Sequence, residues 1–208
     1  MTTTPSDTTR TRRKILAVLA GGLVLGVGAA ITLAAWNDSE FATGTFTAGS
    51  FNLQGSTTSA TAGFSDHNVT KGDTAAALTF SAPFSNLTPG DVVYAPFWVR
   101  LDSATTSNAT LVASTGTATG ANAVNISYSV YSIAAGATCD ATATTGTLVA
   151  SGADLTTFTA GSSVALTKGA TAGTAGTAAQ LCFIATAKSS LTQGGVATGT
   201  WSFTATSN

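Results

Sequence analysis

Two patterns of hydrophobic and polar positions divide the 208-residue chain. Residues 15–35 carry no charge, and Thr32 is the only hydroxyl residue among these 21 positions. As a helix rising about 1.5 Å per residue, they would span roughly 30 Å, the thickness of a bilayer core. After this run, short stretches alternate between hydrophobic and polar residues, a pattern typical of β-strands. We therefore expect an N-terminal membrane or targeting segment followed by a β domain.

The N-terminal run has a basic start, over residues 1–14, and a small-residue end. Four basic residues precede it: Arg10, Arg12, Arg13 and Lys14. Two interpretations are open, a membrane anchor with its basic end in the cytoplasm or a long signal peptide cut at Ala34 or Ala35. Four glycines weaken the run as a permanent helix, since each costs about 1 kcal/mol against alanine. We favour a signal peptide over residues 1–35, which leaves residues 36–208 as the mature chain.

The alternating stretches predict about nine short strands and no helix after the leader. In the best of them, Val93, Ala95, Phe97, Val99 and Leu101 point to one face. The expected strands are residues 45–53, 74–80, 91–102, 109–114, 123–133, 148–150, 164–166, 180–187 and 199–206. Turn signals between them favour a single antiparallel β-sandwich domain of jelly-roll type, with an immunoglobulin-like sandwich as the alternative.

Individual residues refine this expectation. Pro96 cannot donate to a sheet ladder, so we expect an edge or a bulge there. Residues 54–73 and 168–179 are polar or low in complexity, and we interpret them as loops. The expected core faces of two later strands comprise Val124, Ile126, Tyr128 and Val130, and Trp201 and Phe203. In the strand over 180–187, Leu181, Phe183 and Ala185 share one face and Cys182 and Ile184 the other.

Composition limits the partners. Charged residues make up 8% of the chain, against about 25% in ordinary soluble domains. Residues 36–208 hold four basic and eight acidic residues, a net charge of about −4, which argues against nucleic acid or an anionic membrane as a partner. So little charge repulsion favours self-association, although a monomeric, salt-tolerant surface protein would have the same composition.

The chain contains two cysteines, Cys139 and Cys182. In an exported protein an even pair predicts one disulfide. Closing the loop from Cys139 to Cys182 would stabilise the fold by roughly 4 kcal/mol in the chain-entropy model. The alternative is a pair of buried free thiols in neighbouring strands.

Two stretches of sequence resemble a known family. The first is Ala35-Trp36-Asn37-Asp38 followed by Thr45-Phe46-Thr47-Ala48-Gly49-Ser50-Phe51-Asn52-Leu53, and the second is Phe84-Ser85-Asn86-Leu87-Thr88-Pro89-Gly90-Asp91. Over residues 15–53 and 84–101 the chain is similar to the TasA/camelysin family, with Trp36 in place of that family's Phe. The resemblance implies cleavage at Ala34 or Ala35 by a SipW-type signal peptidase, export, and assembly into fibres of a biofilm matrix.

The sequence offers little catalytic chemistry. A zinc site of the HExxH kind needs two histidines and a glutamate, whereas His67 is the only histidine and Glu40 the only glutamate. Some camelysin-like proteins are classed as metallopeptidases, but that assignment does not carry over to these residues. No G-x-S-x-G elbow accompanies His67. We therefore predict no enzyme and no cofactor.

Two other binding hypotheses remain open. Asp66 and Asp73 flank a glycine-containing loop and could bind Ca²⁺, although solvated aspartates are the simpler interpretation. Tyr94 and Trp98 share one face of a strand and could stack sugar rings, but packing against a neighbouring strand or subunit is the commoner reason for such a pair.

These observations favour a secreted structural subunit that assembles into extracellular fibres. Removal of the leader would free residues 36–53 to add as a strand to the open sheet edge of the next copy, and such a head-to-tail contact propagates a filament. The residues expected to carry this contact are Trp36, Phe41, Phe46, Phe51 and Leu53. The expected partners are further copies, the signal peptidase and other matrix or cell-wall components. The alternatives are a monomeric adhesin or glycan-binding module and, less favoured, a metallopeptidase.

Overall fold

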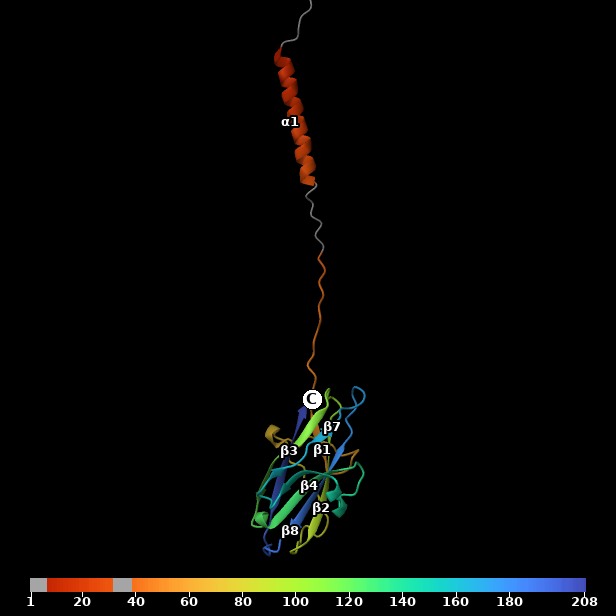
Figure 1. Ribbon diagram of the computed structural model, residues 1–208, viewed down its shortest axis with the longest axis vertical. Helices are drawn as coiled ribbons and strands as arrows, with labels where there is room; N and C mark the ends of the chain where they lie inside the picture. Colours follow the sequence, from red (N-terminus) through yellow and green to blue (C-terminus); the bar gives the residue numbers. More distant parts are fainter. Residues whose placement is uncertain (1–6, 32–38) are drawn as a thin grey trace, which may run out of the picture. The chain divides into compact units, whose positions relative to one another are not determined.

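The computed structural model describes residues 7–31 and 39–208, which fall into two compact units, residues 1–46 and 47–208 (Figure 1). The first unit contains the helix α1 (Asp7–Ile31), which takes in the basic residues and most of the apolar run. None of the described helices has the length and apolar character needed to cross a membrane. The predicted cleavage site, Ala34 and Ala35, lies outside the described residues, as does Trp36.

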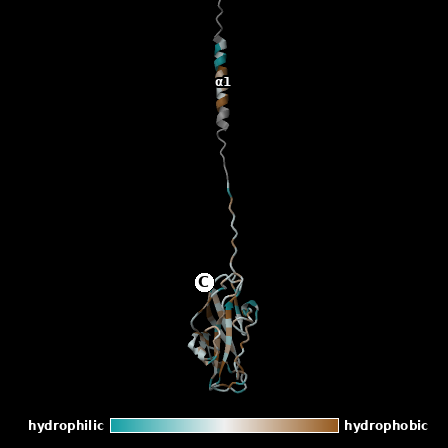
Figure 2. Ribbon diagram, turned by 90° about the vertical axis from the view of Figure 1, so that its right-hand side faces the viewer, coloured by the Kyte–Doolittle hydropathy of each residue, from teal (hydrophilic) through white to brown (hydrophobic). Residues whose placement is uncertain are grey.

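The second unit contains nine strands and three short 3-10 helices. The strands are β1 (Leu53–Ser56), β2 (Val92–Leu101), β3 (Ala109–Thr119), β4 (Ile126–Ile133), β5 (Thr147–Gly152), β6 (Thr159–Ala160), β7 (Val164–Leu166), β8 (Ala179–Ala187) and β9 (Thr198–Ser207). The 3-10 helices are η1 (Val69–Lys71), η2 (Ala123–Asn125) and η3 (Ala141–Thr145). Figure 2 shows few strongly hydrophilic segments in this unit, as its small number of charges leads one to expect.

The strands form two antiparallel sheets. One has six strands in the order β1-β2-β8-β4-β5-β6, and the other has three in the order β7-β3-β9. Every pairing between strands in the two sheets is antiparallel. Both sheets contribute to one core, so the predicted antiparallel, sandwich-like all-β domain is confirmed at this level.

The core is aliphatic where the sheets meet and aromatic toward β9. Leu101, Leu111 and Leu181 come from both sheets and are fully buried. The ring of Phe183 on β8 lies 5.0 Å from that of Trp201 and 6.0 Å from that of Phe203, both on β9. Aromatic contacts at these distances add to the free energy of burial itself. Strand β9 therefore contributes the aromatic part of the contact between the sheets, while β3 and β7 contribute buried aliphatic side chains such as Leu111 and Leu166.

Strand β2 follows the predicted alternation, with Val93, Ala95, Val99 and Leu101 buried and Phe97 partly buried against the same core. The Tyr94 carbonyl accepts from the Ser81 amide, on the side of β2 away from β8. The N–H and C=O groups of successive residues in a strand point to opposite sides, so the backbone of Pro96 faces the same side as that of Tyr94. The missing N–H of Pro96 thus costs no bond to β8, and the predicted edge position is confirmed.

Several expected strands differ from those in the structure. Residues 74–80 form no strand, because Leu78 and Phe80 reach the core from an irregular segment without a ladder. The strand expected over 45–53 begins only at Leu53, and the loop expected over 54–73 loses its first three residues to β1. The prediction for Val124 was wrong, since it lies in η2 with 53% of its surface exposed. Strand β6 was missed.

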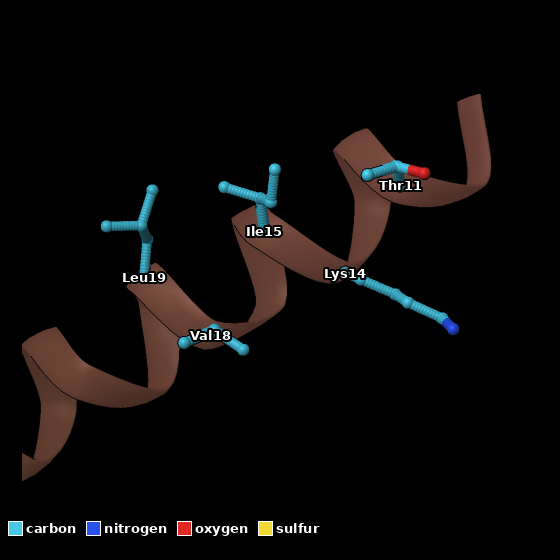
Figure 3. Close-up of a pocket in the computed structure, with 5 residues that line it drawn as sticks. All are labelled: Thr11, Lys14, Ile15, Val18 and Leu19. Atoms are coloured by element: carbon cyan, nitrogen blue, oxygen red, sulfur yellow. The ribbon is translucent and has the colours of Figure 1, made fainter. Parts of the chain in front are cut away.

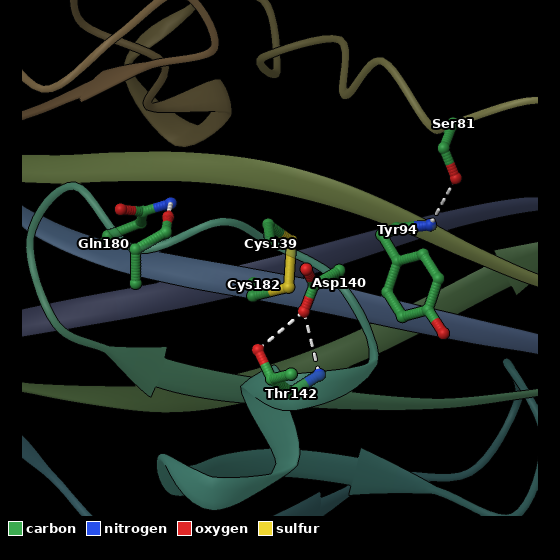
Figure 4. Close-up of a disulfide and its surroundings, with 8 residues drawn as sticks. Ser81, Tyr94, Cys139, Asp140, Thr142, Gln180 and Cys182 are labelled. Carbon is green, nitrogen blue, oxygen red and sulfur yellow. Dashed lines mark hydrogen bonds between the residues drawn. A yellow bond between two sulfur atoms is a disulfide. The ribbon is translucent and has the colours of Figure 1, made fainter.

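The predicted disulfide joins Cys139 and Cys182, and no cysteine is free. Figure 4 shows it between β8 and the loop that leads into η3. Cys182 is fully buried in a small cluster with Ile184 and Ala143, apart from the main core. The bond therefore ties a long loop to the middle of the six-stranded sheet, and the alternative of two free thiols was wrong.

Candidate functional site

The segment before β1 exposes two large hydrophobic side chains. Residues 39–49 belong to no strand or helix, and Phe41 and Phe46 within them are 96% and 97% exposed. An isolated exposed phenylalanine is ordinary, but two almost fully exposed rings within six residues make an unburied apolar segment. Burying such a segment against a partner surface lowers the free energy of the system.

The polypeptide becomes fixed to the domain at residues 50–52. Ser50 forms a parallel bridge with Thr105, and its hydroxyl donates to the Ala104 carbonyl. The Asn52 amide donates to the Thr105 hydroxyl at 2.9 Å, and the Asn52 carbonyl accepts from the Asp102 amide at 3.1 Å. The domain's own hold on its N-terminal segment thus begins at Ser50.

The residues predicted for assembly therefore have different surroundings. Phe41 and Phe46 are exposed, Phe51 is 39% exposed beside the anchored residues, and Leu53 packs against the domain's own core. Trp36 lies outside the described residues. Within the described part of the predicted donated segment, residues 36–53, the part free to meet a partner comprises residues 39–49.

This free segment has the alternation of a half-buried strand. Extended, residues 42–48 would place Thr43, Thr45 and Thr47 on one face. The other face would hold Ala42, Gly44, Phe46 and Ala48. The segment is apolar on one side and hydroxyl-bearing on the other, without a charge on either.

The four outer edges of the two sheets are unequal. Strand β1 has four residues and is bridged on its outer side by paired bonds of 3.0 Å between Gly55 and Ser65. Strands β6 and β7 have two and three residues. Strand β9 has ten residues and pairs only with β3. The sequence could not reveal this edge, because the partner of β9 lies about ninety positions earlier in the chain.

His67 is held by neutral partners. Its Nε2 lies 3.1 Å from the Ser65 hydroxyl and its Nδ1 lies 3.1 Å from the Thr74 carbonyl. The neighbouring Asp66 instead accepts from the Asn52 side-chain amide at 2.8 Å. A catalytic triad requires a carboxylate on the second ring nitrogen, and here that position is taken by a backbone carbonyl.

The proposed calcium ligands are engaged separately. Asp66 binds Asn52, whereas Asp73 accepts from the Asn68 amide at 3.2 Å in the turn around η1. Across residues 7–31 and 39–208, no three His, Cys, Asp or Glu side chains gather closely enough to hold a metal ion. The Asp73 carboxylate serves to close a local turn.

The aromatic pair on β2 is partly covered. Tyr94 packs beside Ile184 and the disulfide, and both Tyr94 and Trp98 are half-buried. The indole Nε1 of Trp98 is buried without a hydrogen-bond partner. Tyr94 is therefore part of the packing on the outer face of the six-stranded sheet, and both rings keep some exposed surface.

Each of the two units has a shallow hollow on its described surface. Figure 3 shows the first on α1, lined by Thr11, Lys14, Ile15, Val18 and Leu19. The second lies between residues 103–106 and 168–173 and has one titratable group, Lys168.

The shifted pKa values belong to structural groups. Burial raises the pKa of Tyr128, whose hydroxyl donates to the Thr157 carbonyl. Hydrogen bonds from the hydroxyl and the amide of Thr142 lower the pKa of Asp140, which caps η3 (Figure 4). The Thr156 hydroxyl does the same for Asp154. The carboxylates of Asp140 and Asp154 thus stabilise local turns.

Comparison with known proteins gives no assignment: no family model matches the chain, and no curated protein matches it at a significant level.

Proposed function

We propose that the protein is a secreted structural subunit that assembles into extracellular fibres by donating its N-terminal segment to the next copy. The observation that carries this proposal is the nearly complete exposure of Phe41 and Phe46 in a segment that belongs to no strand of its own. The uncharged alternation of residues 42–48 supports the same reading, because it is the pattern of a strand with one face awaiting burial.

The finer features of the proposal follow from the sequence. Residues 1–35 act as a signal peptide removed by a signal peptidase at Ala34 or Ala35, as the resemblance to the TasA/camelysin family implies. The disulfide supports an oxidising, extracellular location. The domain is of the jelly-roll type, a proposal supported by the way the chain passes repeatedly between the two sheets. Further copies are the main partner, with other matrix components joining them.

The test compares a chain that begins at Trp36 with one that begins at Thr47. Residues 47–208 form a compact unit with all nine strands and the core, so the shorter chain keeps its fold. A cut after Leu53 would remove the Asn52 bonds and the first residue of β1. Electron microscopy should show filaments of the longer chain only, and the shorter chain added to it should cap their growth.

A point substitution gives the same test within the longer chain. Phe46→Ser should abolish filaments, because it removes the largest apolar side chain of the donated face. Phe84→Ser is the matched control, since Phe84 is 53% exposed on the folded domain itself. Filaments from Phe46→Ser, or a monomeric longer chain at high concentration, would refute the proposal.

A further inference from the structure

We propose that the free edge of β9 is the acceptor site of the fibre, and that residues 42–48 of a second copy bind there as an added strand. The inference rests on the proposed function and names the surface on which it operates. Its occupant is a defined segment of the same chain, and its recognition chemistry is backbone hydrogen bonding with one apolar side-chain face.

The backbone of β9 has a row of unused groups. The Asn208 amide donates to the Asn108 carbonyl, which fixes the phase of the ladder between β9 and β3. Because backbone direction alternates along a strand, every second residue of β9 directs its N–H and C=O away from β3. These residues are Gly199, Trp201, Phe203, Ala205 and Ser207. None of them forms a backbone hydrogen bond on that side within the part of the chain that the structure describes.

The side chains of β9 match the alternation of the donated segment. Trp201, Phe203 and Ala205 are half-buried against the core, while Thr200, Ser202 and Thr204 are exposed. A strand formed by residues 42–48 would continue both faces, with Phe46 extending the aromatic end of the core and its threonines continuing the exposed hydroxyl row. An added strand therefore buries apolar surface on one side and leaves hydroxyls in water on the other.

The β9 edge also lacks the usual protection. Edge strands of monomeric proteins are commonly kept apart by lysine, proline, bulges or short length. Strand β9 is ten residues long and contains neither a charged residue nor a proline. The other three outer edges are short, and β1 is covered by Ser65 as well. Of the described edges, β9 is thus the one suited to accept a strand.

A competing edge lies on β3. Strand β7 pairs only with Ala109–Leu111, so residues 112–119 of β3 have no strand on that side. A register shift between Ala113 and Thr115 interrupts this stretch. A bulge twists an edge and breaks the regular spacing of its donors and acceptors. The interruption lies in β3, so the outer edge of β9 stays regular.

Cross-linking distinguishes the two edges. Thr45→Cys in the chain that begins at Trp36 is combined with a cysteine at Thr200, Ser202 or Thr204 on β9. The matched controls place the second cysteine at Thr117, Thr115 or Val112, the exposed register partners of those residues on β3. Oxidation of assembled filaments should give a ladder of covalent oligomers from at least one β9 pair and none from the β3 set. Ladders from the β3 set alone, or from neither set, would overturn the assignment.

A backbone substitution provides an independent test. Ala205→Pro removes an N–H that faces away from β3, so it costs no bond within the domain but removes a donor for the incoming strand. Ala205→Ser is the matched control that retains the N–H. Circular dichroism should show both variants folded, and filaments should be lost only in Ala205→Pro. Filaments from folded Ala205→Pro would overturn the acceptor assignment while leaving the proposed function intact, whereas a monomeric parent chain would overturn both.

Discussion

The link between Cys139 and Cys182 should be among the largest single contributions to the stability of the domain. It closes a loop with a sequence separation of 43 residues, which holds η3 and strands β5, β6 and β7. In the chain-entropy model, a loop of this length corresponds to about 4 kcal/mol at 25 °C. For a domain of this size, that free energy corresponds to a fall in melting temperature of roughly 8–16 °C.

The perturbation is Cys139→Ala combined with Cys182→Ala, because a single replacement would leave an unpaired thiol. Chemical denaturation followed by tryptophan fluorescence should give a free energy of unfolding lower by about 4 kcal/mol. Cys182 is fully buried, so the cavity left by its sulfur should add about 1 kcal/mol. The slope of the free energy against denaturant should rise, since an unlinked chain exposes more surface when it unfolds.

Reduction provides the control for this measurement. A reductant should destabilise the parent chain by nearly the same amount and should leave the double variant unchanged. A double variant within about 1 kcal/mol of the parent would refute the reasoning, because the loop would then be closed in the unfolded state without the bond.

Three further predictions follow from individual contacts. Asn122→Ala should lower the free energy of unfolding by about 3 kcal/mol in denaturant titrations, because the buried amide of Asn122 bonds the carbonyls of Thr192 and Gly195. Gly120→Ala should cost about 2 kcal/mol or more by the same assay, since its φ is +97° and an added Cβ would meet a carbonyl oxygen at 2.3 Å. Folding lowers the pKa of Asp154 below its ordinary value of 3.8, so the ionised carboxylate stabilises the fold at pH values above 3.8. This contribution is lost as the pH falls through the lowered pKa. NMR titration of Thr156→Val should show the pKa of Asp154 rising toward that ordinary value.

Period-two alternation predicted the strands that pair on both sides or cover the core. Val93 to Leu101 shows the pattern because every second side chain must enter the core. In β8 the intervening Cys182 and Ile184 are buried as well, in the second cluster. The same pattern misled at residues 74–80, where Leu78 and Phe80 are placed by packing without a ladder. Strand β6 was missed because its two residues are both exposed, so no side-chain pattern marks them.

The candidate site was only half visible in the sequence. The Phe-bearing segment could be found from its own residues, since alternation and the absence of charge are local properties. The free edge of β9 could not be found in this way, because an edge is the side of a strand that no other strand pairs with. Strand pairing is not a local property, since β9 pairs with β3 residues about ninety positions earlier in the chain. The burial of Tyr94 beside the disulfide was hidden for the same reason.

The anchoring of residues 50–52 has a mechanical consequence. If copies are joined through the segment that precedes Ser50, tension along the fibre enters each domain at the bonds of Ser50 with Ala104 and Thr106. The bonds of Asn52 with Thr105 and Asp102 carry the load next. Only after these yield would the load reach the pairing of Leu53–Ser56 with Trp98–Leu101. A pulled filament should therefore lengthen first by peeling a few residues from each domain, long before the sheets themselves separate.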